Sequence, residues 1–280
     1  MKSHGTQSGR SIRLQRIWKH ERAVIIPYDH GAYSGVVRGL ENPLRLTERI
    51  AATRADAVLV APGVLRTVAT AVKQLGVVLR MDGGHTAFAG VPSDYQSFVG
   101  AEDALRLGAD AGIVFTFIGI PDEPASLLRL GRMAADADIW GLPLIAEVLP
   151  PGLLNNHFGS GIFPKGKKNA DVVGDTRNVA RIAVETGADI IKTRYTGDVA
   201  SFRSVVDTCG APVIVAGGPK LDGTDESLLR FARDCVRAGA AGIIFGRNVW
   251  QHPKMEKLIA ALCALVHEEE SVESALKLLR

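Results

Sequence analysis

Short apolar runs rich in β-branched residues recur along the whole chain, and they constrain the fold more than any other feature. Each run is too short for a typical helix and is apolar on both faces, which is typical of parallel strands covered by helices. Amphipathic stretches separate most of them and predict helices at 43–54, 95–107, 124–140, 175–186, 199–209 and 225–238. The predicted strands are 23–28, 56–61, 77–81, 110–117, 143–148, 189–193, 212–216 and 241–245.

A small repeat marks the start of every second predicted strand. Gly-Ala-Asp stands at 108–110 and 187–189, and close variants stand at 54–56 and 239–241. Glycine ends a helix in the left-handed conformation, and alanine lets the chain turn tightly into the sheet. Eight such strand–helix units predict an α/β fold, a single (β/α)8 TIM barrel. An open doubly wound sheet is the alternative, but no Gly-x-Gly-x-x-Gly follows the first strand.

The length of 280 residues suits one such barrel. We expect residues 1–20 to form an N-terminal tail and lead-in segment, frayed over the polar residues 1–10, and residues 21–280 to form the catalytic barrel. Residues 1–10 lack the apolar segment of a signal peptide, and no apolar run is long enough to span a bilayer.

Charge and cysteine content narrow the class of protein further. The net charge of +3 is too small for this length to indicate a nucleic-acid or membrane partner. Cys209, Cys235 and Cys263 show no metal or redox spacing, so we expect reduced, buried thiols in a cytoplasmic protein. No spacing of His, Asp or Glu indicates a metal site, and His157, His252 and His267 are expected on the surface.

The active site of a barrel lies at the C-terminal ends of its strands. Polar residues and glycines are concentrated after the predicted strands, which predicts one functional rim. The residues concerned are Asp29, His30, Asp82, His85, Glu147, Lys192, Arg194, Tyr195, Gly217, Gly218, Lys220, Gly246 and Arg247.

Lys192 is the most informative of these residues, because it ends a buried apolar strand. A buried lysine is costly to desolvate, and its amine can attack a carbonyl to form a Schiff base. The alternative is structural: the side chain reaches solvent or pairs with Asp198 or Asp29.

The loops after the seventh and eighth predicted strands have the composition of a phosphate site. Gly217, Gly218 and Gly246 let backbone N–H groups approach an anion closely, and Lys220 and Arg247 add positive charge. These two loops are the usual phosphate site of barrels. The alternative is that the glycines only make tight turns.

Together these strings resemble the archaeal-type class I fructose-bisphosphate aldolase family, which includes the DeoC/LacD-like and DhnA-type aldolases. The resemblance covers roughly residues 20–270 in the same order. It rests on Ile-Pro-Tyr-Asp-His-Gly at 26–31, Gly-Ala-Asp-Ile-Ile-Lys-Thr-Arg-Tyr-Thr-Gly-Asp at 187–198, Ala-Gly-Gly-Pro-Lys at 216–220 and Gly-Arg-Asn-Val-Trp-Gln at 246–251.

The resemblance implies a metal-independent, cofactor-free barrel enzyme that works through a lysine Schiff base. Lys192 matches the Schiff-base lysine and Asp29 matches the aspartate that binds substrate hydroxyls near the scissile bond. His30, Arg194 and Tyr195 belong to matching strings and are expected near the substrate. Gly217, Gly218, Lys220, Gly246 and Arg247 match the phosphate cradle. Members are usually large rings, often decamers, so a homo-oligomer is implied.

One departure from the family concerns the proton-shuttling tyrosine, which lies in a pattern like Tyr-Pro-Arg-Gly. The string at 147–152 is Glu-Val-Leu-Pro-Pro-Gly, so Leu149 stands at the tyrosine position. Leucine cannot exchange a proton. Glu147 ends the same strand on the same side and is the first candidate to replace the tyrosine, with Tyr195 and Tyr28 as weaker ones. A salt bridge from Glu147 to Lys192 or Arg194 is the structural alternative.

Three functions follow as hypotheses. The first is a class I aldolase that acts on a phosphorylated keto sugar such as fructose 1,6-bisphosphate through an iminium on Lys192. The second, suggested by the missing tyrosine, is a thiolase-like acyl transfer from a phosphorylated dione to coenzyme A. The third is a non-catalytic phosphosugar-binding barrel, against which the retention of Lys192 argues.

Overall fold

The computed structural model describes residues 4–88, 95–158, 171–218 and 223–280. Eight parallel strands close into a barrel in the order β1-β10-β9-β8-β7-β6-β3-β2, so the predicted (β/α)8 fold is confirmed. All eight predicted strands are present. They are β1 (Ala23–Pro27), β2 (Ala57–Val60), β3 (Gly76–Arg80), β6 (Ala111–Thr116), β7 (Leu144–Val148), β8 (Ile190–Arg194), β9 (Val213–Ala216) and β10 (Gly242–Ile244).

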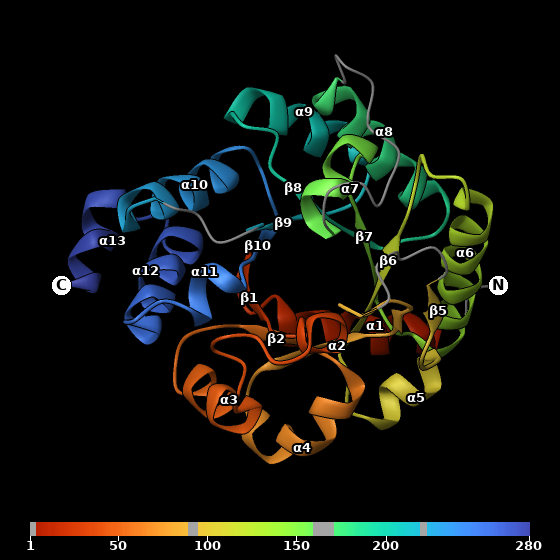
Figure 1. Cartoon of the computed structure of the whole chain (residues 1–280), viewed down its shortest axis with the longest axis horizontal. Helices are drawn as coiled ribbons and strands as arrows, with labels where there is room; N and C mark the ends of the chain where they lie inside the picture. Colours follow the sequence, from red (N-terminus) through yellow and green to blue (C-terminus); the bar gives the residue numbers. More distant parts are fainter. Residues whose placement is uncertain (1–3, 89–94, 159–170, 219–222) are drawn as a thin grey trace.

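Helices surround the strands in a ring, which Figure 1 shows with the strands at its centre. The ring contains α3 (Pro43–Ala51), α4 (Pro62–Val72), α5 (Ala101–Arg106), α6 (Glu123–Trp140), α8 (Val172–Glu185), α9 (Val199–Cys209), α10 (Asp225–Arg237) and α12 (Met255–His267). Three further helices follow strands β1, β7 and β10, and a fourth packs on α10 and α12. They are α2 (Gly31–Ser34), α7 (Pro151–Phe158), α11 (Arg247–Trp250) and α13 (Val272–Leu279).

The predicted helix at 95–107 is wrong in its first half. Gln96–Ser97 forms a short strand, β5, which pairs antiparallel with β4 (Asp82–Gly83), and α5 begins only at Ala101. The aromatic residue at the start of this stretch belongs to a buried cluster rather than to a helix face. Tyr95 is buried among Phe115 and Phe117, at the C-terminal opening of the barrel.

The barrel interior is layered because side chains alternate between the two faces of each strand. An apolar layer fills the interior with Ile25, Leu59, Val78, Ile113, Ile145, Ile190, Ile214 and Ile244. Two residues further along β3, β7 and β8, the same inward direction is taken by Arg80, Glu147 and Lys192, and all three are buried. A charged layer therefore lies directly above an apolar one, at the C-terminal opening.

The N-terminal segment differs from the expected tail, because residues 4–17 form helix α1 (His4–Ile17). Ile17 is fully buried against the interior apolar cluster, with Leu14 and Trp18 beside it. The Trp18 indole donates a hydrogen bond to the carbonyl of Ala241 (2.8 Å). The segment thus covers the N-terminal end of the barrel, away from the charged layer.

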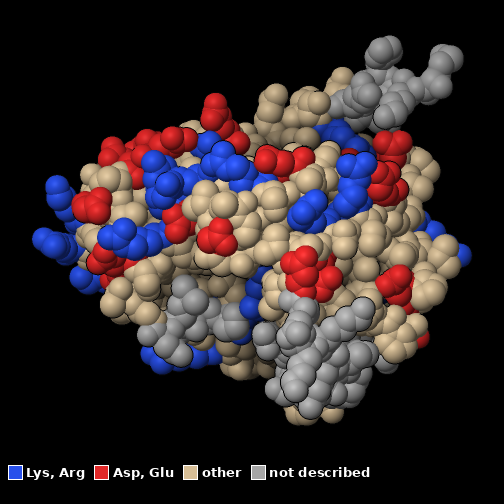
Figure 2. Space-filling view, turned by 90° about the horizontal axis from the view of Figure 1, so that it is seen from above, with Lys and Arg blue, Asp and Glu red and all other residues tan. Residues whose placement is uncertain are grey.

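The surface charges in Figure 2 are mixed in sign, and the three cysteines are buried. The face in Figure 2 carries Lys and Arg interspersed with Asp and Glu. Cys209, Cys235 and Cys263 are free and buried, as predicted. Within the described ranges, no helix is both long and apolar enough to cross a bilayer.

Candidate active site

Lys192 and Glu147 form a buried ion pair at the centre of the charged layer. Strands β7 and β8 are adjacent, and their register places the two residues directly side by side. The Nζ–Oε1 distance is 2.7 Å, and the side chains are 8% and 5% exposed. The Lys192 side chain is therefore largely buried and paired with Glu147 rather than extended into solvent. Asp198, one of its predicted partners, instead caps α9 by accepting a hydrogen bond from the Ser201 N–H (2.9 Å).

Arg80 bridges three carboxylates around this pair. Its guanidinium lies 2.9 Å from Asp29 and 3.4 Å from Asp82, and it also pairs closely with Glu147. Burial by itself lowers the pKa of the guanidinium, but the carboxylates outweigh it and hold that pKa well above its usual value. Buried charges are tolerated only when paired in this way.

Sequence reasoning missed Arg80. The signal that identifies it is the alternation along β3, where Val78 points into the barrel and Arg80 follows two residues later. A charged residue at an inward position near the C-terminal end of a barrel strand is a candidate for the site.

Asp82 completes the charged layer two residues beyond Arg80. Burial raises its pKa to about 6, although Arg80 and Arg129 oppose the shift. Its Oδ2 accepts a hydrogen bond from the Phe115 N–H (2.8 Å) and lies 3.6 Å from the guanidinium of Arg129. Asp82 thus helps to hold Arg80 in place.

His30 lies beside Asp29, as its place in the sequence indicates. Its Nδ1 is 3.6 Å from Asp29 Oδ1, and its ring meets the Trp250 ring edge-on at 5.6 Å. The pKa of His30 is lowered to about 4, mainly by burial; Asp29 opposes this shift, and the charges of Arg247 and Lys192 reinforce it. His30 is therefore neutral at pH 7. A neutral imidazole can hydrogen-bond to a substrate, but it carries no positive charge to attract an anion.

Two pockets meet at Lys192, and both are lined by His30, Glu147 and Lys192. The first extends over the charged layer towards β3, and its other lining residues include Asp29, Tyr33, Arg80, Asp82 and His85. The second extends towards β9 and β10, and its other lining residues include Leu149, Arg194, Gly217, Gly218, Gly246 and Arg247. A molecule that spans both pockets passes directly over the Lys192 amine.

The second pocket is lined by four of the five residues predicted to bind a phosphate, namely Gly217, Gly218, Gly246 and Arg247. Gly218 has a φ of +72°, and a Cβ on Gly246 would lie 3.0 Å from the Pro27 carbonyl, so both positions favour glycine. Burial lowers the pKa of Arg194, and the nearby charge of Arg247 lowers it further. Two guanidinium groups that repel each other in a pocket favour a bound anion. Lys220 lies outside the described residues.

Tyr195 does not line either pocket, which corrects its expected place near the substrate. Arg194 points inward, so the next residue points outward. The Tyr195 ring packs between α9 and α10, with centroids 5.3 Å from Phe202 and 5.5 Å from Phe231. Tyr195 contributes to packing outside the barrel.

The position of the family tyrosine is apolar in this chain. Leu149 is buried in a cluster with Tyr95, Phe115, Phe117 and Leu154. Tyr28, one of the suggested substitutes, faces α3, where its hydroxyl is 2.8 Å from Thr47 Oγ1. Glu147 is thus the one of the three suggested substitutes that lies against Lys192.

An aromatic stack closes the far side of the first pocket, and sequence reasoning missed most of it. The His85 ring lies between Tyr33 and Tyr95, with centroid distances of 5.9 Å and 5.8 Å. His85 Nδ1 is 3.0 Å from the Tyr95 hydroxyl. Tyr33 lies in the short helix α2, and His85 and Tyr95 lie outside helices and strands, so no periodicity indicates that these side chains meet.

Comparisons with known proteins agree with this geometry. Residues 23–252 match the profile of the family described as DeoC/LacD family aldolase. A 2-amino-3,7-dideoxy-D-threo-hept-6-ulosonate synthase of Halobacterium salinarum is 35% identical, over 97% of this chain and 96% of that protein. An uncharacterised aldolase of Saccharolobus solfataricus is 32% identical, over 97% and 99% of the two chains.

Among solved structures, a Schiff-base-forming fructose-1,6-bisphosphate aldolase superposes with a TM-score of 0.78 at 28% identity, covering 92% of this chain and 99% of that one. An archaeal fructose 1,6-bisphosphate aldolase superposes with a TM-score of 0.77 at 29% identity, with the same coverage. The family match, the relatives and the buried lysine at the strand end lead to one conclusion: the chain belongs to the DeoC/LacD family of class I aldolases, lyases that act through a Schiff base.

Proposed function

We propose that this enzyme makes or breaks a carbon–carbon bond in a phosphorylated ketose, with Lys192 as the nucleophile. The observation that carries the proposal is the buried Lys192–Glu147 pair at the junction of two pockets, one polar and one rich in glycine and arginine. A phosphate in the second pocket leaves the rest of the substrate to extend across Lys192 into the first.

Lys192 provides the electron sink. Its neutral amine attacks the ketone carbon to give a carbinolamine, which loses water to become an iminium. The iminium accepts the electron pair of the adjacent carbon–carbon bond as that bond breaks. An enamine stays on Lys192 and an aldehyde leaves. The reverse sequence forms the bond.

Glu147 exchanges protons with the reacting atoms. It contacts Nζ at 2.7 Å, so it can accept a proton as the amine becomes neutral and return one to the departing carbinolamine hydroxyl. Leu149 has no proton to exchange, and this is why we assign the role to Glu147. Asp29 is the proposed acceptor for the proton of the substrate hydroxyl beside the scissile bond.

Arg80 is a positioning residue in this scheme. Its ion pairs with Asp29 and Glu147 fix both carboxylates at the first pocket. Holding reacting groups in place before the substrate arrives lowers the entropic part of the barrier.

The glycines and arginines of the second pocket are proposed to grip the phosphate. Backbone N–H groups around Gly217, Gly218 and Gly246 can approach its oxygens, and Arg194 and Arg247 supply charge-assisted hydrogen bonds. Lys220 is proposed to join them. Binding energy gained at this remote phosphate is used to position the ketone.

Fructose 1,6-bisphosphate is the first substrate to test, because structural relatives are named as aldolases of that sugar. The enzyme is incubated with it, and triose phosphate release is followed for wild type and Lys192→Arg. Release that disappears in the variant supports the proposal, while release that persists in it contradicts the assignment of Lys192.

A second arm tests the thiolase-like alternative, which the leucine at the position of the family tyrosine suggests. A phosphorylated dione is offered with and without coenzyme A. Product that forms only with coenzyme A, together with no cleavage of ketose phosphates, would replace the aldolase proposal with acyl transfer.

A further inference from the structure

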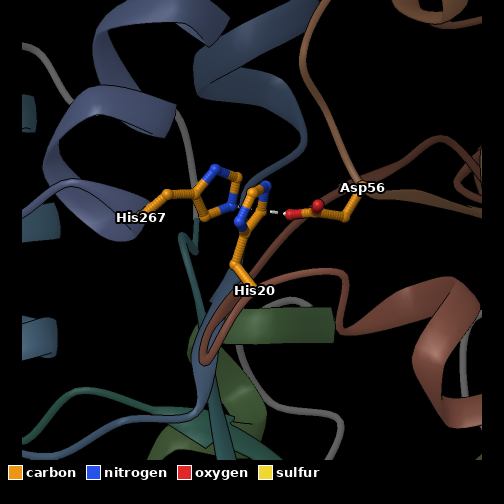
Figure 3. A group of neighbouring side chains, drawn as sticks. All are labelled: His20, Asp56 and His267. Carbon is orange, nitrogen blue, oxygen red and sulfur yellow. Dashed lines mark hydrogen bonds and ion pairs between the residues drawn. The ribbon is translucent and has the colours of Figure 1, made fainter.

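Three potential metal ligands meet at the end of the barrel opposite the candidate active site. His20 lies in the bend between α1 and β1, Asp56 directly precedes β2, and His267 is the last residue of α12 (Figure 3). One ligand atom from each lies within 4.8 Å of the others. Because the three segments are far apart in the sequence, no spacing of residues predicts their meeting.

Asp56 and His267 form a buried, fixed half of this cluster. Asp56 is 1% exposed, and its Oδ2 accepts hydrogen bonds from the Val24 N–H (2.7 Å) and from His267 Nε2 (2.8 Å). The His267 side chain is 2% exposed, which corrects its expected place on the surface. Its Nδ1 is buried without a hydrogen-bond partner among the described residues.

His20 forms the movable half. It is exposed, it lies in a bend rather than in a helix or strand, and its ring centroid is 4.1 Å from that of His267. An exposed imidazole on a bend can rotate at little cost, so its nitrogen can close on an ion held by the buried pair. Figure 3 shows the His20 ring beside both partners.

We propose that His20, Asp56 and His267 bind one divalent transition-metal ion, with Zn²⁺ as the expected occupant. Two imidazoles and one carboxylate form a ligand set that Zn²⁺ accepts, with bonds of about 2.0–2.2 Å and a fourth, water-filled position. Drawing atoms now within 4.8 Å onto one ion requires only a small movement of His20.

The binding step has a defined proton balance. His267 Nε2 gives up its hydrogen bond to Asp56 when that nitrogen takes the metal: the proton of a neutral imidazole moves to Nδ1, and the extra proton of an imidazolium is released to solvent. Protons and the metal compete for the same ligand atoms, so binding weakens as the pH falls.

The proposed ion has a structural role. It joins the lead-in segment, the start of β2 and the end of α12, which closes the N-terminal face of the barrel. That face of a TM barrel serves stability rather than catalysis. The plain alternative is a His267–Asp56 ion pair at a helix C-terminus, which needs no metal.

A second His–Asp pair in the chain offers a matched control. His252 Nε2 lies 3.0 Å from Asp225 Oδ1, and among the described residues no second histidine joins that pair in a group that could hold an ion. His20→Asn removes the proposed third ligand at an exposed position, and His252→Asn makes the same change at the control pair.

The full chain, freed of metal by chelation, is titrated with Co²⁺ at pH 7.5 while visible absorption and Tm are recorded. The proposal predicts one Co²⁺ per chain, displacement by Zn²⁺ and a rise in Tm. It also predicts at least tenfold weaker binding in His20→Asn, unchanged binding in His252→Asn and wild-type Tm for both apo variants.

Two results would overturn the proposal. One is the absence of saturable binding near one ion per chain. The other is equal affinity in wild type and His20→Asn, and in that case His30→Asn is titrated to test whether the ion sits at the candidate active site instead.

Discussion

At the scale of single residues, the site consists of a few charges whose partners fix their roles. Lys192 is paired with Glu147, and Arg80 holds Glu147, Asp29 and Asp82 together. Removing one charge therefore has consequences for its neighbours as well as for the reaction.

Glu147→Gln tests the proton-exchange role. Glutamine retains the size of the side chain and can still hydrogen-bond to Lys192, but it cannot take or give a proton at neutral pH. We expect the formation of a reducible Lys192–ketone adduct to slow by about 10²- to 10⁴-fold, the usual worth of general acid–base catalysis. Adduct formation is followed by mass spectrometry, with the exposed Glu185→Gln as control. An unchanged rate would remove Glu147 from the mechanism.

Arg80→Met tests the electrostatic frame. The substitution leaves buried carboxylates without their cation, which typically costs about 3–5 kcal/mol. The exposed Arg181, paired with Glu185, gives the matched control Arg181→Met, for which we expect a loss below about 1 kcal/mol. Urea unfolding measures both. Equal losses for the two variants would show that the Arg80 cluster contributes nothing special to stability.

At the scale of elements, strands were easier to predict than the segments around them. Each strand is a short run of apolar residues, a pattern typical of a buried strand. Residues 4–17, in contrast, are polar enough to predict a tail, yet they form α1. What decides their structure is a distant contact, namely the open end of the barrel that Ile17 and Trp18 cover. The prediction of a helix at 95–107 was wrong in its first half for a similar reason, because β5 forms by pairing with β4.

Ile17→Ala tests whether α1 is an integral part of the barrel. Ile17 is 0% exposed, so truncation leaves a cavity and should cost about 2–5 kcal/mol of unfolding free energy. Ile12 lies on the same helix at 62% exposure, and we expect Ile12→Ala to change stability by less than about 0.5 kcal/mol. Chemical denaturation compares the two. Similar small effects would mean that α1 is only loosely attached.

The candidate site shows the same division between residues that can be predicted from their own strand and residues whose role depends on distant contacts. Lys192, Glu147 and the glycine loops were predictable because each ends a recognisable strand. Alternation along β3 indicates that Arg80 points inward, but Asp29 and Glu147 meet it only when the barrel closes, so its role was missed. Tyr195 was misplaced because a shared string says nothing of which face a residue occupies, and strand alternation turns it outward.

At the scale of the whole molecule, burial of ionisable side chains at the candidate site makes the stability of the fold depend on pH. His30 has a pKa of about 4 in the folded state, below its usual 6.5. Its contribution to the free energy of unfolding is therefore fully present above pH 6.5 and is lost as the pH falls towards 4. Asp82 has a folded pKa of about 6, above its usual 3.8, so it acts in the opposite sense and favours folding as pH falls from 6 to 3.8.

His30→Asn separates these two effects. Between pH 7 and pH 4 the wild type should lose on the order of 3 kcal/mol of stability through His30, and the variant should not. The measurement is the difference between the unfolding free energies of wild type and variant at each pH. A difference that stays constant across this range would show that His30 is not held neutral by burial.

The central claim is that Lys192 forms a Schiff base with a phosphorylated ketone, and trapping it is the most direct test. The enzyme is treated with borohydride in the presence of dihydroxyacetone phosphate, and the product is examined by intact mass and peptide mapping. The account predicts one reduced adduct per chain, located on Lys192 and absent from Lys192→Arg. No adduct, although the phosphate compound binds, would contradict the account.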